Sequence, residues 1–198
     1  CDVYKGIFAI AREYFALYQL QLGRDETHPL SIKAQQAFSL CAEIGGLTLL
    51  ALDMRSERTK SQVISAESWK AIYDWLDATS PRRRRQTPSA RHLLLMSSIP
   101  VVHPEFALLE KLLGIPWRQE LEDDLRDQWL SVPHRQERLR LVHRLLAFAD
   151  AKKCRVTVLS GDVHVGALGI VESTRSTADD PSTQVINQLT SSGIVMSP

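Results

Sequence analysis

The feature that most constrains the fold of this chain is the run LTLLAL at residues 47–52. It is apolar at almost every position, as expected of a strand that is covered on both faces of a sheet. Gly45 and Gly46 precede it, and another apolar run at residues 36–42 precedes the glycines, so we predict a hairpin. A strand of this kind requires further layers of structure around it.

Other runs predict the elements of those layers. Strand character is found at residues 92–99, 154–159, 165–172, 183–189 and 193–196, and helical periodicity at residues 3–22, 65–78, 105–113 and 135–152. Strands alternate with helices early in the chain and cluster late, which predicts an α/β fold with a mixed sheet. We expect the last helix to bury Leu139, Val142, Leu145, Leu146 and Ala149. A length of 198 residues favours a single domain over residues 1–198.

Composition excludes several classes of protein. The apolar runs are far shorter than the roughly 20 residues that span a bilayer, so we expect no membrane segment. A net charge of +1 disfavours a general binder of nucleic acid. Three cysteines, an odd number without metal-like spacing, disfavour a disulfide framework. This cysteine usage favours a reducing compartment such as the cytoplasm without fixing the location.

The sharpest candidate site is the stretch SGDVH at residues 160–164, which places Asp162 and His164 just after the strand predicted at residues 154–159. Gly161 allows a sharp turn, and alternating positions of an extended segment place both side chains on one side. A carboxylate and an imidazole suit a divalent metal. The alternative is a structural aspartate in a turn beside a hydrogen-bonded histidine.

Polar residues also follow the two preceding strands. Asp53, Arg55 and Arg58, with Glu57 among them, come after the buried strand and are candidates for binding a phosphate, for which arginine offers bidentate contacts. The alternative is an exposed cluster of ion pairs. His103 follows the strand at residues 92–99 closely enough to lie at the same sheet edge, where it is a candidate metal ligand, acid or substrate contact. The alternative is that Pro100 and the two valines after it turn His103 away from this edge.

Three other groups have alternative interpretations. His134 and Arg138 lie one helical turn apart, as in a surface pair or a pocket wall. Asp124, Asp127 and Trp129 could line a pocket, or serve as helix caps and a packed indole. The four arginines at residues 82–85, from Arg82 to Arg85, stand in a loop between prolines, where such a run either contacts nucleic acid or is simply solvated.

Four stretches together resemble the C-terminal part of the PhoD-like phosphatases, in the metallophosphoesterase superfamily. They are residues 52–59, residues 97–100, residues 124–129 with 134–138, and residues 160–164 with 188–193. The resemblance implies a four-layer αββα sandwich, with helices outside two sheets, and a phosphoester substrate. It also implies metal ions (Fe, Mn, Ca or Zn), which polarise phosphoryl oxygens and activate water. His164 would align with the final metal-ligand histidine and Asp162 with the preceding ligand position, where many relatives carry histidine, so the resemblance implies that both are metal ligands and catalytic residues. The candidates for substrate contact are those selected by their positions after strands, namely Asp53, Arg55, Arg58 and His103.

The earlier metal-binding motifs of that superfamily do not occur ahead of residue 160. One aspartate and one histidine cannot hold two ions, because a catalytic metal normally draws at least three protein ligands. We therefore expect this chain to be the C-terminal part of a longer enzyme, whose N-terminal half completes the site and covers part of the sheet. The alternative is an inactive relative kept as a binding module, with its arginine run contacting nucleic acid.

Overall fold

The computed structural model describes residues 2–23, 26–32, 37–78, 92–102, 129, 134–161, 166–173 and 185–191. Contacts between Cα atoms divide the chain into two units, Cys1–Ser31 and Ile32–Pro198. The first unit contains helix α1, Asp2–Gln19, which confirms the predicted helix. Its apolar side chains are exposed, and no side chain between Asp2 and Gln19 is buried. The packing expected for this apolar face is therefore not present among the described residues of this unit.

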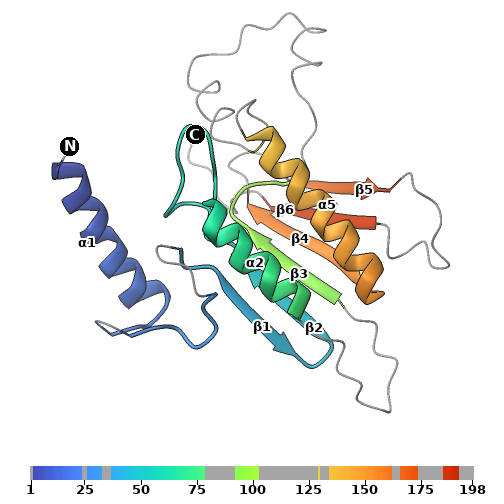
Figure 1. Cartoon of the computed structure of the whole chain (residues 1–198), viewed down its shortest axis with the longest axis horizontal. Coiled ribbons are helices and arrows are strands. Elements are labelled where there is room, and N and C mark those ends of the chain that lie inside the picture. Colours follow the sequence, from blue (N-terminus) through green and yellow to red (C-terminus); the bar gives the residue numbers. More distant parts are fainter. Residues whose placement is uncertain are drawn as a thin grey trace, which may run out of the picture. The chain divides into compact units, whose positions relative to one another are not determined.

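The second unit is built around a mixed sheet (Figure 1). Its described strands are β1 (Leu40–Ile44), β2 (Leu47–Ala51), β3 (His92–Ser97), β4 (Arg155–Gly161), β5 (Ala167–Glu172) and β6 (Val185–Ser191). They are ordered β1-β2-β3-β4-β6-β5. Strands β2, β3, β4 and β6 are parallel to one another, whereas β1 and β5 are antiparallel to their neighbours at the two edges. This arrangement confirms the predicted α/β fold with a mixed sheet.

The predicted hairpin joins β1 to β2, with a turn that is tighter than expected. Ile44 pairs with Leu47, so β1 continues beyond residue 42 and only Gly45 and Gly46 remain in the turn. Gly45 has φ of 62°, a conformation that glycine adopts without the steric cost that a Cβ brings. The glycine pair therefore fixes the register of the two strands.

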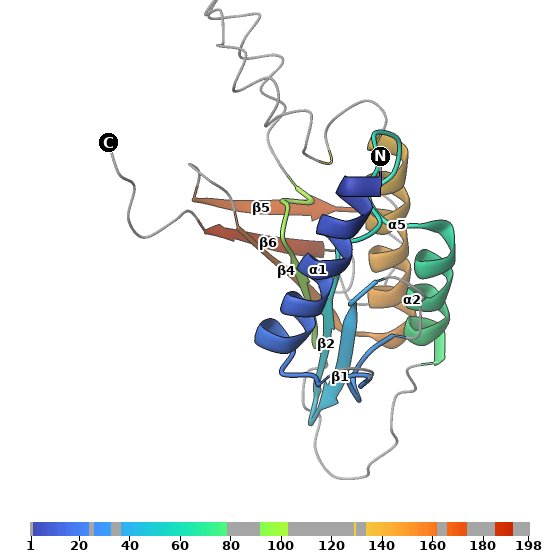
Figure 2. The same cartoon turned by 90° about the vertical axis from the view of Figure 1, so that its left-hand side faces the viewer.

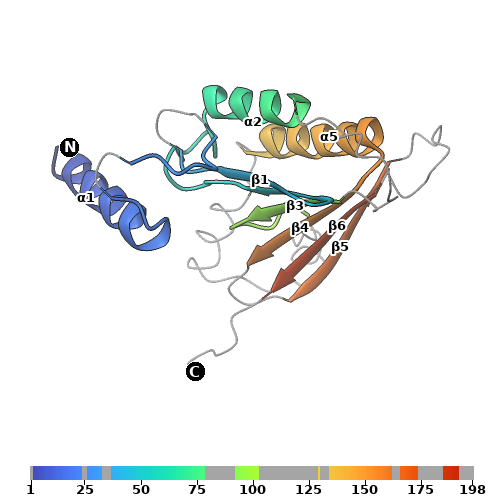
Figure 3. The same cartoon turned by 90° about the horizontal axis from the view of Figure 1, so that it is seen from below.

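Helices α2 (Ala66–Ala78) and α5 (Arg135–Lys152) both cover one face of the sheet, as Figures 2 and 3 show. The chain steps in the same direction from β2 to β3 and from β3 to β4, and right-handed crossovers then place both helices on the same side. The Ser65 hydroxyl accepts a hydrogen bond of 3.2 Å from the Ser68 N–H and caps α2. None of the described helices is long and apolar enough to cross a membrane.

The main core lies between these helices and the sheet. It contains Trp69, Ile72 and Leu76 from α2, Leu141, Leu145, Phe148 and Ala149 from α5, and Leu50, Leu93, Leu95, Val156, Val158 and Ile186 from the strands. The face predicted for α5 was partly wrong, because Leu139, Val142 and Leu146 are only half-buried. The buried face is instead turned toward Glu137, whose carboxylate accepts backbone hydrogen bonds from Val63 and Ile64.

The opposite face of the sheet, called the open face below, has no helix of this unit over it among the described residues. It exposes Ile44, Met96, Leu168, Ile170 and Leu189. Leu168 pairs directly with Leu189, and both alternate with positions that face the helices. Leu47 and Leu49 of β2 are half-buried, so among the described residues the cover predicted on both faces of this strand is complete on the helical face and partial on the open face.

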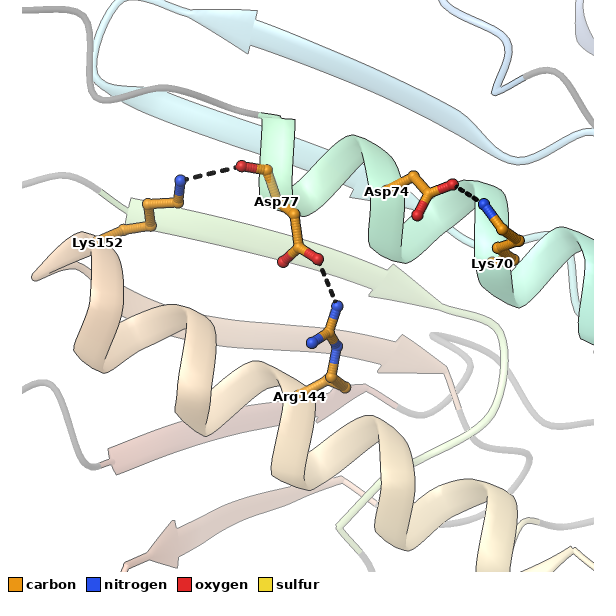
Figure 4. A network of polar contacts seen from close by, with 5 residues as sticks. All are labelled: Lys70, Asp74, Asp77, Arg144 and Lys152. Carbon is orange, nitrogen blue, oxygen red and sulfur yellow. Dashed lines mark hydrogen bonds and ion pairs between the residues drawn. The ribbon is translucent and has the colours of Figure 1, made fainter.

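Exposed polar contacts join α2 to α5 (Figure 4). The Arg144 guanidinium donates to Asp77 Oδ2 at 2.8 Å, and Lys152 Nζ donates to the Asp77 carbonyl at 3.3 Å. Arg144 also lies over the Tyr73 ring, 4.8 Å from its centroid. Such exposed ion pairs contribute about 0–1 kcal/mol each, so the buried core holds the two helices together.

Candidate functional site

The carboxyl ends of β2, β3, β4 and β6 meet at one edge of the sheet, where open α/β sheets bind ligands. Strand β4 lies between β3 and β6 and continues to Gly161, two residues beyond the predicted end. It does so because Ser160 pairs with Ser97 on one side, and Gly161 pairs with Ser191 on the other. Asp162 and His164 follow Gly161 in the chain and lie outside the described residues, as does His103.

Asp53, at the carboxyl end of β2, has both carboxylate oxygens engaged by backbone groups. Its Oδ2 accepts from the Phe38 N–H at 2.8 Å, and its Oδ1 accepts from the N–H groups of Arg55 and Ser56 at 3.0 Å each. The Asp53 N–H donates in turn to Ser39 Oγ at 3.0 Å. Asp53 therefore ties the loop after β2 to the segment before β1.

These contacts also set the charge of Asp53. Partial burial by itself raises the pKa of this carboxyl group, but hydrogen bonds from the Ser56 side chain and from the backbone of Phe38, Arg55 and Ser56 outweigh it and lower the pKa. Asp53 is thus held in its anionic form as part of the loop. Arg55 beside it is exposed, and Arg58 is half-buried. The substrate contacts assigned to these three residues stay predictions.

Glu137 is a buried carboxylate that joins this same loop to α5. Its Oε2 accepts from the Val63 N–H at 2.8 Å, and its Oε1 accepts from the Ile64 N–H at 2.9 Å and from Trp69 Nε1 at 2.6 Å. Its side chain is only 8% exposed. The three donors compensate the loss of hydration, so Glu137 anchors the loop that carries Asp53, Arg55 and Arg58.

His134 stands just before α5 and faces the loop rather than the solvent. It is 3% exposed, and its Nε2 lies 3.3 Å from the Thr59 carbonyl oxygen. A carbonyl can only accept, so Nε2 carries the proton in this contact. Four residues later, Arg138 Nη1 donates to the Val101 carbonyl at 3.4 Å. The interpretation of His134 and Arg138 as a surface pair is therefore wrong.

Trp129 is fully buried and packs edge-on against Trp69, with 6.1 Å between ring centroids. The packed-indole interpretation is confirmed for this residue. Its companions Asp124 and Asp127, and the arginines at residues 82–85, lie outside the described residues.

The buried amide of Gln188, on β6, is the second polar anchor at this edge. Its Oε1 accepts from the N–H groups of Val101 and Val102 at 2.8 and 2.7 Å. Its Nε2 donates to the Val102 carbonyl at 2.6 Å and to Thr190 Oγ1 at 2.9 Å. The hydroxyl groups of Thr190 and Ser160 share a further hydrogen bond of 3.0 Å. Gln188 therefore holds the segment that leaves β3.

Neither anchor was assigned a role from the sequence. Gln188 could have been noticed, because it occupies an inward position between Ile186 and Thr190 where the strand pattern calls for an apolar residue. Glu137 gave no such signal, since an acidic residue in the first turn of a helix is ordinary.

The part of the chain that the structure describes contains no group of three or more His, Cys, Asp or Glu side chains placed to hold a metal ion. A metal centre at this edge would therefore depend on Asp162 and His164 and on ligands from elsewhere. One feature of the described residues suits such a centre: Gly161 ends β4 at the carboxyl edge of the sheet, and Asp162 and His164 follow it in the sequence.

Comparisons with known proteins agree with the resemblance found in the sequence. Residues 107–198 match the family model described as PhoD related phosphatase, which confirms the resemblance to PhoD-like phosphatases. The chain is also 31% identical over 146 residues to the uncharacterized protein YGR266W of Saccharomyces cerevisiae. That alignment covers 62% of this chain and 20% of the yeast protein, so the chain spans about a fifth of its relative. No solved structure matches the chain.

Proposed function

We propose, from the similarity of residues 107–198 to PhoD related phosphatases, that this chain is the C-terminal part of a metal-dependent phosphoester hydrolase. Asp162 and His164 bind metal and act in catalysis, and Asp53, Arg55, Arg58 and His103 contact the phosphoester. A metal ion bound there would supply Lewis acidity toward the phosphoryl group. The remaining ligands come from chain that precedes these residues in the natural protein.

The position of Gly161 in the sheet is the structural observation that most supports this proposal. It ends β4 between two parallel strands, β3 and β6, so the residues that follow it leave from the middle of the carboxyl edge. This is the position from which α/β sheets present ligand-binding residues. The loop that carries Asp53, Arg55 and Arg58 leaves β2 at the same edge and is anchored by Glu137.

The open face supports the corresponding fold, a four-layer αββα sandwich. The described part of the unit supplies one helical layer and one sheet, and exposes large apolar side chains on the far side of that sheet. Sheets packed face to face bury side chains of this kind. We propose that a second sheet, built by the preceding half of the domain, covers the open face and brings the missing metal ligands.

Hydrolysis by the full-length natural protein tests the proposal. A generic phosphomonoester and a generic phosphodiester are supplied with Mn, Ca, Zn or Fe, and wild type is compared with Asp162→Asn and His164→Ala. His143→Ala is the matched control, because His143 is an exposed histidine on α5. We expect metal-dependent turnover that falls at least about a hundredfold in the two site variants and is unchanged in the control. Equal turnover in His164→Ala and wild type would contradict the assignment.

A further inference from the structure

We propose that Gln188 is a positioning residue for the reaction, because its side-chain amide fixes the path by which the chain leaves β3. The segment concerned, residues 98–102, is called the strap. The inference rests on the proposed function, in which His103, the residue directly after the strap, contacts the phosphoester. Gln188 itself touches the strap and not the substrate.

The amide of Gln188 is fully used in holding the strap. It is 0% exposed, and three of its four hydrogen bonds go to the backbone of Val101 and Val102. An amide offers two acceptor positions and two donor hydrogens, and all four are occupied. Rotating the amide by 180° would set its NH₂ against two N–H donors, so the contacts define its orientation.

The path of the strap follows from the sheet order. Strand β3 is separated from β6 by β4, yet Val101 and Val102 bond to Gln188 on β6. Gln188 faces the same side as the buried residues Ile186 and Val158. The strap therefore crosses β4 on the helix-covered face, and its path is set by contacts with β6.

Two neighbouring residues shape the same crossing. Gly169 of β5 pairs with Gln188, and a Cβ added to it would lie 3.0 Å from Val102 Cγ1, so glycine leaves the room that Val102 occupies. From the helical side, Arg138 Nη1 donates to the Val101 carbonyl. The strap is thus held by hydrogen bonds from β6 and α5, and β5 leaves the room that it needs.

A purely apolar residue would serve packing at this position at lower cost. A buried amide loses hydration and gains nothing unless it is fully hydrogen-bonded. Here its bonds satisfy three strap groups that have left the ladder of β3. This use of an inward position indicates that the place of the strap matters for the residue it delivers.

The test uses the full-length natural protein with Gln188→Leu, which keeps the approximate volume and removes the amide. Hydrogen exchange is measured at the Val101 and Val102 amides, and kcat and KM are measured with a phosphomonoester. Ile186→Ala is the control, because it destabilises the same inward face of β6 without removing a hydrogen bond to the strap. Gly169→Ala is a second variant, which pushes on Val102 while leaving the amide in place.

We expect exchange at Val101 and Val102 to accelerate roughly tenfold or more in Gln188→Leu, because the N–H groups of a buried and a half-buried residue lose their acceptor. We expect KM to rise severalfold in both Gln188→Leu and Gly169→Ala, with metal content unchanged. In a His103→Ala background the Gln188 substitution should add no further loss, since both act through one contact. The control should show neither effect.

Two results overturn the inference, and they are distinct from failure of the proposed function. Unchanged exchange at Val101 and Val102 in Gln188→Leu shows that the amide does not hold the strap. Faster exchange with wild-type kcat and KM shows a structural role alone. A wild-type protein that hydrolyses neither ester with any of the metals instead overturns the proposed function, and the positioning role of Gln188 with it.

Discussion

Replacing Glu137 by leucine should release the loop that carries Asp53, Arg55 and Arg58. The carboxylate accepts hydrogen bonds from two backbone N–H groups, those of Val63 and Ile64, and from the Trp69 indole. Leucine fills much of the same volume but accepts none of these bonds. Three buried donors then lose their partner at once.

The size of the effect follows from those three bonds. A hydrogen bond to a charged group contributes about 1.5–3 kcal/mol, but bonds to one carboxylate are not additive. We therefore expect Glu137→Leu to lower the free energy of unfolding by about 3–5 kcal/mol. Glu137→Gln can keep its oxygen at the Oε1 position, facing Ile64 and Trp69, and loses mainly the bond to Val63, so about 1.5–3 kcal/mol is expected.

The assay is urea unfolding of the full-length protein followed by tryptophan fluorescence, because Trp69 is a partner of Glu137 and packs against Trp129. Hydrogen exchange at the Val63 and Ile64 amides locates the change. Glu43→Gln is the control, since Glu43 is exposed on β1, and it should change stability by less than about 0.5 kcal/mol. A loss below about 1 kcal/mol in Glu137→Leu, with exchange unchanged, would refute the anchoring role.

Three further outcomes follow from the structure. Leu168 lies on the open face and is 67% exposed, so Leu168→Lys should change the free energy of unfolding of the 198-residue chain by less than about 0.5 kcal/mol. In the full-length protein the same substitution should lower it by about 2 kcal/mol or more, measured by thermal unfolding. Equal effects in the two proteins would contradict a second sheet that covers this face. Asp53→Asn should lower the free energy of unfolding by about 1–2 kcal/mol at neutral pH and by almost nothing in acid. Because the pKa of Asp53 is lowered in the folded protein, its contribution to stability is complete above the ordinary value of about 3.9 and is lost as pH falls through the lower folded value. Unfolding measured at several pH values tests this. Burial raises the pKa of Tyr73 to about 12, so ultraviolet titration should find a late phenol that is absent in Tyr73→Phe. The contribution of Tyr73 to stability should be complete below about pH 10 and be lost as pH rises toward about 12. A Tyr73→Phe variant that keeps the late transition would contradict this.

Local patterns in the sequence were sufficient for most of the elements. The glycine pair at residues 45–46 predicted the hairpin, and periodicity predicted α2 and α5 to within a residue, because turn chemistry and amphipathic spacing are properties of neighbouring residues. The end of β4 was misjudged, since its last residues are held by Ser97 and Ser191 on other strands. The buried face of α5 was misjudged for a similar reason, because Glu137 meets Val63 and Ile64 from a distant loop.

In the candidate site, too, local features could be predicted from the sequence, whereas contacts between distant residues could not. Residue type and position after a strand were enough to select Asp53, but its engagement with the Phe38 backbone depends on a contact 15 residues away. Gln188 acts on residues 86 and 87 positions earlier, and only the parallel pairing of β4 with β6 brings them together. Glu137 has no local signature, and the inward polar position of Gln188 does not indicate which distant residues it contacts, so sequence patterns did not reveal these contacts.

If the residues after β4 bind metal, the metal content of the protein should depend on Asp162 and His164. Full-length wild type, Asp162→Ala, His164→Ala and the control His143→Ala are purified with Mn, Ca, Zn or Fe present, and bound metal is measured per mole of protein. We expect bound metal in wild type and in the control, and loss of about one equivalent or more in each site variant, because each removes a direct ligand. Equal metal content in all four proteins would contradict it.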